Sequence, residues 1–122
     1  MKESTGNSAP PIIIAEIGCN HKGDFDIAKE MIHIAKVFCK VDYVKFQKRN
    51  NKELLSEEQY NTPHPVSYHA YGDTYGKHRE YLEFNMEQHA ELKKYCEELN
   101  IGYSCSVWDL QSLKEMIELD IE

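Results

Sequence analysis

The 122-residue sequence predicts an α/β protein built around a parallel sheet. Short apolar runs typical of strands alternate with segments whose apolar residues recur at helical spacing. The order along the chain is strand, helix, strand, long insert, helix, strand, helix. The strand-like runs also end in polar residues that a purely structural strand would not carry. The length allows at most one ordinary domain.

The first strand is predicted over residues 11–17, an isoleucine-rich run whose continuous apolar character favours burial on both faces. Residues 1–11 before it are predicted to be a flexible lead, because they lack the hydrophobic stretch of a signal peptide. A helix follows the strand, with Asp24 as its N-cap. The predicted apolar face of this helix consists of Ile27, Met31, Ile34, Ala35 and Phe38.

The second strand is predicted over residues 41–47. Its period-two alternation places Val44 and Phe46 on one side, and Lys45 and Gln47 on the other. An ammonium group on a strand of this kind is costly to bury unless it is paired or used. The pattern therefore favours a functional Lys45, and the alternative is a lysine whose charge extends to solvent at the strand end.

The second half of the chain repeats the alternation. Asn85 and Gln88 resemble a capping box before a helix. The predicted inner stripe of that helix consists of His89, Leu92, Cys96 and Leu99, with His89 as a packing residue. A third strand is predicted over residues 101–107, followed by a helix that Asp109 caps. The residues predicted to face inward from this last helix are Leu110, Leu113, Met116 and Ile117.

The insert over residues 48–84 is too long for an ordinary connection between a strand and a helix. A short helix is predicted within residues 52–59, and residues 61–81 are dense in tyrosine and histidine. Long loops with a composition of their own are often lids or binding loops. The insert is therefore interpreted as a lid, and the alternative is a surface excursion with its own aromatic packing.

Composition restricts the classes of function. A net charge of −7 argues against nucleic-acid binding and against a basic membrane anchor. No apolar run approaches the ~20 residues that span a bilayer, and with no export signal a cytoplasmic location is expected. The four cysteines are then expected to be reduced thiols, because none forms a C-x-x-C pair. Cys19 and His21 alone make a poor metal signature.

Polar residues gather at the ends of all three predicted strands. In parallel α/β folds these ends meet at one edge, where reactive residues lie. A cation and fixed hydrogen-bond donors there suit a small anionic substrate. The residues concerned are Glu16, Asn20 and His21 after the first strand, Lys45 and Gln47 on the second, and Cys105, Ser106, Trp108 and Asp109 on the third.

Two motifs in this set carry a family resemblance. The sequence A-E-I-G-C-N-H-K-G begins at Ala15, and V-K-F-Q begins at Val44 after the intervening helix. Their order and spacing resemble the start of the sialic acid synthases, the N-acetylneuraminate synthase family. The resemblance runs from about residue 12 to the end of the chain.

The resemblance implies a (β/α)₈ barrel of which about the first three βα units are present. It implies condensation of phosphoenolpyruvate with an N-acetylated amino sugar, N-acetylmannosamine or a relative, in a homodimeric enzyme. Lys45 matches the lysine that binds phosphoenolpyruvate, and Glu16 matches a catalytic glutamate beside it. Gln47, Asn20 and His21 match motif positions, and together with Ser106 at the end of the third strand they are expected to bind substrate. A divalent metal, manganese or magnesium, is implied, with ligands in later strands outside this chain.

The sequence also departs from the family pattern. Where the family's third strand often ends in S-T-P-F, this chain has Cys105 in place of the serine, which leaves the sugar open. The chain is expected to be an N-terminal fragment of the barrel, inactive by itself. Two alternatives remain: a non-catalytic α/β module that binds a phosphorylated small molecule or a partner chain, and a different barrel aldolase or synthase.

Overall fold

The computed structural model describes residues 8–121, so most of the predicted flexible lead lies outside the described residues. Residues 8–13 form neither helix nor strand. No helix within residues 8–121 is both long and apolar enough to cross a membrane. The elements, in chain order, are β1 (Ile14–Gly18), α1 (Phe25–Val37), β2 (Tyr43–Lys48), α2 (Asn51–Leu54), α3 (Glu57–Asn61), a 3₁₀ turn η1 (Ser67–His69), α4 (Tyr75–Tyr81), α5 (Met86–Glu98), β3 (Gly102–Val107) and α6 (Leu110–Glu118).

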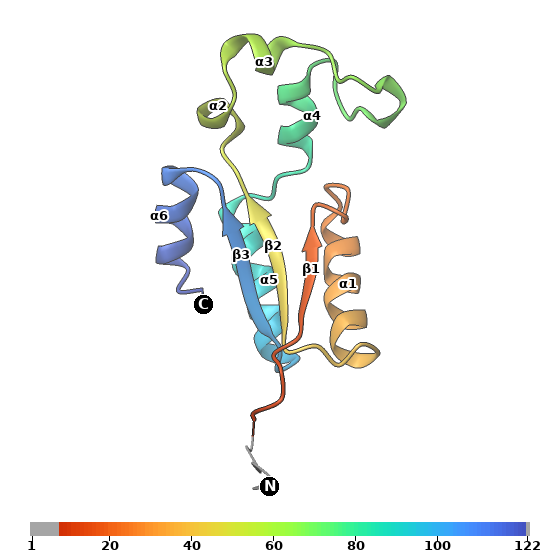
Figure 1. Ribbon diagram of the computed structural model, residues 1–122, viewed down its shortest axis with the longest axis vertical. Coiled ribbons are helices and arrows are strands. Elements are labelled where there is room, and N and C mark those ends of the chain that lie inside the picture. The colour runs from red at the N-terminus through yellow and green to blue at the C-terminus, as the bar shows by residue number, and fades with distance from the viewer. Residues whose placement is uncertain (1–7, 122) are drawn as a thin grey trace, which may run out of the picture.

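The described strands form one parallel sheet in the order β1-β2-β3, which confirms the predicted α/β class. The register places Glu16 opposite Lys45, and Gln47 opposite Ser106. All three strands therefore end at the same edge of the sheet, and the helices of the insert lie beyond that edge (Figure 1). Closure of such a sheet into a barrel remains a prediction.

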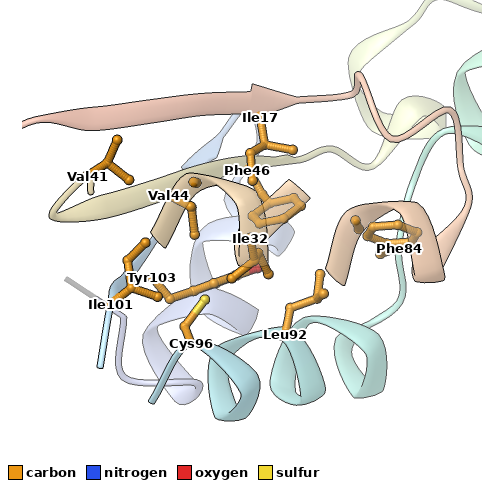
Figure 2. Close-up of a cluster of buried hydrophobic side chains, with 12 residues drawn as sticks. Ile17, Ile32, Val41, Val44, Phe46, Phe84, Leu92, Cys96, Ile101 and Tyr103 are labelled. Atoms are coloured by element: carbon orange, nitrogen blue, oxygen red, sulfur yellow. The ribbon is translucent and has the colours of Figure 1, made fainter. Parts of the chain in front are cut away.

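One face of the sheet carries the hydrophobic core. Val44 and Phe46 of β2 are completely buried, as the period-two pattern predicted. They pack with Ile32 of α1 and with Leu92 of α5, both also fully buried (Figure 2). The predicted inner stripe of α5 is confirmed, because His89, Leu92 and Cys96 have no exposed surface and Leu99 packs against the cluster.

The predicted helix starts are confirmed by their capping bonds. The Asp24 side chain accepts from the amides of Asp26 and Ile27. Asn85 and Gln88 form the reciprocal capping box before α5. Such caps contribute about 0.5–2 kcal/mol each, so these polar residues define where each helix begins.

The predicted apolar face of α1 is largely wrong. The buried residues are Ala28, Ile32 and Ala35, whereas Ile27 is 38%, Ile34 43% and Phe38 74% exposed. The helix has apolar residues on more than one side, and the stripe with two alanines faces the sheet because small side chains allow close approach. Phe38 lies beyond the last helical residue, where the chain turns away.

The predicted inner face of α6 is correct only for Met116. Leu110 and Ile117 are 68% exposed and Leu113 is 41% exposed, whereas the polar Ser112 is fully buried. This helix packs along β3 through Ser112 and Met116. Its other apolar side chains stay largely exposed in the part of the chain that the structure describes.

Burial of the first strand on both faces is also wrong. The strand begins at Ile14, and Ile12, Ile13 and Ile14 are 68%, 51% and 51% exposed. Only Ile17 of β1 is a buried hydrophobic residue. The reason is that β1 is an edge strand of the described sheet, with helices on one face only.

The insert is helical and is anchored to the body of the fold. Two short helices, α2 and α3, replace the single predicted one, because Ser56 starts α3 with its own capping box. The anchor is a close approach at Gly23, whose φ is +75°. A Cβ at this position would lie 2.4 Å from the carbonyl oxygen of Tyr81, so only glycine fits without movement.

The aromatic residues of the insert pack on one another. The rings of Tyr71 and Tyr81 stack with centroids 4.7 Å apart, and Tyr71 also stacks on His78. The His78 ring accepts a hydrogen bond from the Tyr71 amide and is buried. The insert therefore has the internal aromatic packing of a surface excursion, yet it lies at the carboxyl edge where a lid would lie (Figure 1).

Candidate functional site

An ion pair between Lys45 and Glu16 lies at the middle of β1 and β2, before the carboxyl edge of the sheet. Lys45 Nζ lies 2.8 Å from Glu16 Oε2, as expected for residues opposite each other on adjacent parallel strands. Their side chains are 35% and 48% exposed on the sheet face opposite the core. The two charges are thus held together beside solvent, where a charged ligand can reach them without a large desolvation cost.

Gly18 shapes the chain beside this pair. The pairing of β1 with β2 is irregular between Glu16 and Gly18, and Gly18 has a φ of +56°. A Cβ at Gly18 would lie 3.6 Å from both Glu16 Oε1 and Gln47 Nε2. The glycine therefore turns the strand end while the carboxylate of Glu16 and the amide of Gln47 lie on either side of it.

Gln47 is fixed by two donors. Its Oε1 accepts from Cys19 Sγ at 3.8 Å and from Nη2 of Arg49. Burial raises the pKa of Cys19, although Arg49 opposes the effect, so the thiol stays protonated and donates. With its oxygen occupied, the Gln47 side chain has its NH₂ group left to donate to a ligand.

Arg49 extends the site to the end of β3. Its guanidinium carbon lies 4.6 Å from the ring centroid of Trp108, a cation–π contact. Its backbone amide donates to Glu83 Oε2 at 3.0 Å, and the residue is only 9% exposed. Arg49 was not among the predicted site residues, although a basic residue immediately after a strand with a candidate site lysine is a usable signal.

Asp109 connects two strand ends as well as capping α6. Its Oδ2 accepts from the Asn50 amide at 2.7 Å and from the Ser112 hydroxyl at 2.8 Å, and its Oδ1 accepts from the Ser112 amide. Burial alone would raise the pKa of Asp109, but these hydrogen bonds outweigh it and lower the pKa. The carboxylate thus holds the segment after β2 against the start of α6.

Cys105 and Ser106 lie at the end of β3, next to Gln47 in the register. Burial raises the pKa of Cys105 to about 12, which keeps its thiol protonated. The thiol points to a backbone partner, the Ser106 carbonyl oxygen, at 3.7 Å. The four cysteines are free thiols, as predicted.

Asn20 and His21 lie in the turn after β1 and not beside the ion pair. Asn20 Nδ2 donates to the Ile17 carbonyl oxygen at 2.9 Å. The His21 ring is 2% exposed, stacks on Phe84 with centroids 4.2 Å apart, and accepts from the Gly23 amide. Burial lowers the pKa of His21 to about 4. These placements favour a supporting role for both residues.

No group of three or more His, Cys, Asp or Glu side chains within residues 8–121 could hold a metal ion. The described residues therefore do not fit a metal site by themselves. The charged and amide side chains near this edge form a row of neighbours from β1 to Trp108: Glu16, Lys45, Gln47 and Arg49.

Parallel βα sheets commonly bind small molecules at the carboxyl edge, where this chain has charged and amide side chains. The family model that matches residues 31–122 is described as the NeuB family. The chain belongs to this family, which confirms the resemblance to sialic acid synthases.

Curated relatives agree with this assignment. The chain is 40% identical to N-acetylneuraminate-9-phosphate synthase of Homo sapiens over 116 residues, which are 95% of this chain and 32% of that protein. It is 32% identical to N,N'-diacetyllegionaminic acid synthase of Campylobacter jejuni, over 91% of this chain and 33% of that protein. The chain thus spans about a third of the length of the curated relatives it matches.

Solved structures show the same fold. The whole chain superposes with a TM-score of 0.73 on 39% of the N-acetylneuraminic acid synthetase of Leptospira borgpetersenii, crystallised with citrate, at 26% identity. It also matches the spore coat polysaccharide biosynthesis protein SpsE of Bacillus subtilis, with a TM-score of 0.63 and 28% identity over 95% of this chain and 29% of that one.

Proposed function

We propose that this chain supplies the phosphoenolpyruvate side of the active site of a synthase that makes sialic acid-type sugars. The single observation that carries the proposal is the 2.8 Å pair of Lys45 and Glu16 on the open face of a parallel sheet. The names of the relatives, synthases of N-acetylneuraminate 9-phosphate and of diacetyllegionaminic acid, support the reaction class.

The proposed reaction joins phosphoenolpyruvate to the aldehyde of an open-chain N-acetylated amino sugar, N-acetylmannosamine or a relative. A bond forms between C3 of phosphoenolpyruvate and the aldehyde carbon, and the aldehyde oxygen takes up a proton. The oxygen of a water molecule adds to C2. The bond between C2 and the bridging oxygen breaks, the added hydroxyl loses its proton and becomes the C2 carbonyl, and inorganic phosphate leaves with the bridging oxygen.

The side chains of the candidate site have the following proposed roles in this reaction. The Lys45 ammonium binds the anion of phosphoenolpyruvate, in partial exchange for its contact with Glu16. The Glu16 carboxylate orients the substrate or the attacking water. Gln47 and Ser106 donate hydrogen bonds from the neighbouring strand ends, while Asn20 and His21 hold the turn that carries Glu16.

The wider context of the site is also part of the proposal. The described strands begin a (β/α)₈ barrel in a longer, homodimeric and cytoplasmic enzyme, and this chain is inactive alone. The proposed manganese or magnesium ion of such an enzyme would take its ligands from later strands, and within residues 8–121 no group of three or more His, Cys, Asp or Glu side chains could hold it. The insert lies beyond the strand ends (Figure 1), and its proposed role is that of a lid over the mouth of the site.

The phosphorylation state of the sugar is testable. Three carbons of phosphoenolpyruvate precede the six sugar carbons in a nine-carbon product, so a 9-phosphate derives from a sugar 6-phosphate. Because the relatives at 40% identity are 9-phosphate synthases, we expect N-acetylmannosamine 6-phosphate to be used in preference to N-acetylmannosamine. Equal rates with both sugars would contradict this expectation.

The proposed function is tested with Lys45→Ala in an enzyme that contains this segment. The Michaelis constant for phosphoenolpyruvate should rise at least tenfold, about 1.4 kcal/mol or more of lost binding. The matched control is Lys93→Ala, because Lys93 also forms an ion pair, at 3.0 Å with Glu97 on the surface of α5. An unchanged Michaelis constant and turnover in Lys45→Ala would contradict the proposal.

A further inference from the structure

Arg49 is a buried cation, immediately after β2, that no carboxylate neutralises by direct contact. Only 9% of its surface is exposed. The ion pairs of the described residues are formed by three lysines and do not include Arg49. Burying a charge without an ion-pair partner costs stability. This cost indicates that the guanidinium serves a purpose other than stabilising the fold.

Three contacts from different segments hold Arg49 in one orientation. Its backbone amide donates to Glu83 Oε2 at 3.0 Å, at the end of the insert. Its guanidinium carbon lies 4.6 Å from the ring centroid of Trp108, just after β3. Its Nη2 donates to Gln47 Oε1 on β2. With its backbone and its ring contact fixed, the guanidinium has little freedom to turn away from Gln47.

The chemistry of a guanidinium determines which end of the Gln47 amide faces it. Arginine has five N–H donors and no acceptor, so the atom of Gln47 that it contacts must be the oxygen. Nε2 of Gln47 then lies 3.6 Å from the position of a Cβ at Gly18, and Glu16 Oε1 lies at the same distance from that position. The Cys19 thiol also contacts the Gln47 oxygen, but a thiol is both a weak donor and a weak acceptor and selects neither end.

We propose that Arg49 is a positioning residue that turns the NH₂ group of Gln47 toward the substrate, while Trp108 holds the guanidinium in place. Lys45 and Gln47 share one face of β2, so a substrate oxygen bound at Lys45 also accepts a hydrogen bond from Gln47. If the amide were turned over, its oxygen would face the substrate oxygen and repel it. This inference rests on the proposed function, because Arg49 acts through a residue of that site.

A double-mutant cycle in an enzyme that contains this segment tests the proposal. Arg49→Met removes every side-chain donor but keeps the backbone contact with Glu83. The value of kcat/KM should fall about fivefold or more in Arg49→Met. In the Gln47→Ala background the same substitution should lower kcat/KM by less than about twofold, because the amide to be positioned is gone. The assay uses phosphoenolpyruvate with N-acetylmannosamine or its 6-phosphate, whichever reacts faster.

The matched control for Arg49→Met is Lys29→Met. Lys29 Nζ also lies over an aromatic ring, 4.9 Å from the centroid of Tyr95, but it is on α1. Lys29→Met should leave kcat/KM unchanged, and the melting temperature of Arg49→Met should stay equal or rise. Four results would overturn the proposal: no loss in Arg49→Met, equal losses with and without Gln47, a large fall in its melting temperature, or an equal loss in Lys29→Met.

A second measurement needs no substrate. Burial raises the pKa of the Cys19 thiol and the nearby Arg49 opposes this increase, whereas Glu83 and Glu16 add to it. Arg49→Met should therefore move the pH profile of Cys19 alkylation to higher pH. Mass spectrometry follows the reaction, with the exposed thiol of Cys39 as the reference in the same protein. An unchanged profile would contradict the placement of the guanidinium beside Gln47.

This second measurement also separates the two proposals. Failure of the Lys45→Ala experiment would remove the assigned role of Lys45 and would leave the Cys19 profile as predicted. An unchanged Cys19 profile would overturn the role of Arg49, whatever the result for Lys45.

Discussion

The two faces of β2 differ sharply in burial and charge, although their residues alternate along one strand. Val44 and Phe46 are completely buried against α1 and α5. Lys45, between them, is 35% exposed on the other face and pairs with the 48% exposed Glu16. One strand thus contributes at the same time to the core and to a charged pair on the opposite face of the sheet.

The two faces are expected to serve different purposes, stability of the fold on the core face and substrate chemistry on the open face. A buried phenylalanine contributes several kcal/mol to folding, whereas a half-exposed ion pair contributes about 0–1 kcal/mol. We therefore expect substitutions on the core face to change the free energy of unfolding. Substitutions on the open face should change binding and turnover with little effect on the fold.

The largest expected effect is on the core face. Phe46→Ala should lower the free energy of unfolding by about 3–5 kcal/mol, because it removes a fully buried ring and leaves a cavity. Chemical denaturation of the purified chain measures this value. The matched control is Phe38→Ala, because Phe38 is 74% exposed and its loss should change stability by about 0.5 kcal/mol or less. Similar losses in the two variants would contradict the assignment of the core face.

Acid should destabilise the fold through its buried histidines. Burial lowers the pKa of His21 to about 4 and that of His89 to about 3, from 6.5. As the pH falls, these histidines are protonated in the unfolded chain at a higher pH than in the folded chain. Their contribution to the free energy of unfolding is therefore fully present above pH 6.5 and is lost as the pH drops toward 4. For His21 the loss is ~3 kcal/mol.

The test of this effect compares the wild type with His21→Phe, which keeps a ring next to Phe84. At neutral pH the variant should be less stable by about 1 kcal/mol, because the Gly23 amide loses its acceptor. The difference should shrink or reverse as the pH falls to about 4. Parallel stability curves for the two proteins would show that His21 is not the titrating group.

A smaller effect on stability is expected at Asp109, which connects the segment after β2 to the start of α6. Asp109→Ala removes the cap of α6 and the acceptor for the Asn50 amide. We expect a loss of about 1–2 kcal/mol in the free energy of unfolding. Asp24→Ala is the comparison, because Asp24 caps α1 without such a second contact. If Asp24→Ala is the more destabilising of the two, the bridging role of Asp109 is wrong.

The sequence correctly predicted those features of the fold that depend only on residues close together in the chain. The alternation of Val44, Lys45 and Phe46 was correct, because period two is a property of any strand. The caps at Asp24 and Asp109 were correct, because capping involves residues only a few positions apart.

The errors concern residues whose burial or contacts depend on segments that are distant in the sequence. Ile34 of α1 and Ile117 of α6 are apolar at helical spacing, yet both are exposed, because burial depends on which neighbouring elements are present. Arg49 was missed because its contacts with Trp108 and Glu83 join segments far apart in the chain. A role of His21 in substrate binding stays a prediction, and in the structure its ring stacks on Phe84.

The smallest effect on stability is expected at the centre of the site, and Glu16→Gln in an enzyme that contains this segment tests the separation most directly. Turnover and melting temperature should be measured on the same preparation. We predict that turnover falls about 100-fold or more, while the melting temperature stays equal or rises, because the pair with Lys45 is half exposed. A large fall in melting temperature with turnover retained would contradict the account and would make Glu16 a structural residue.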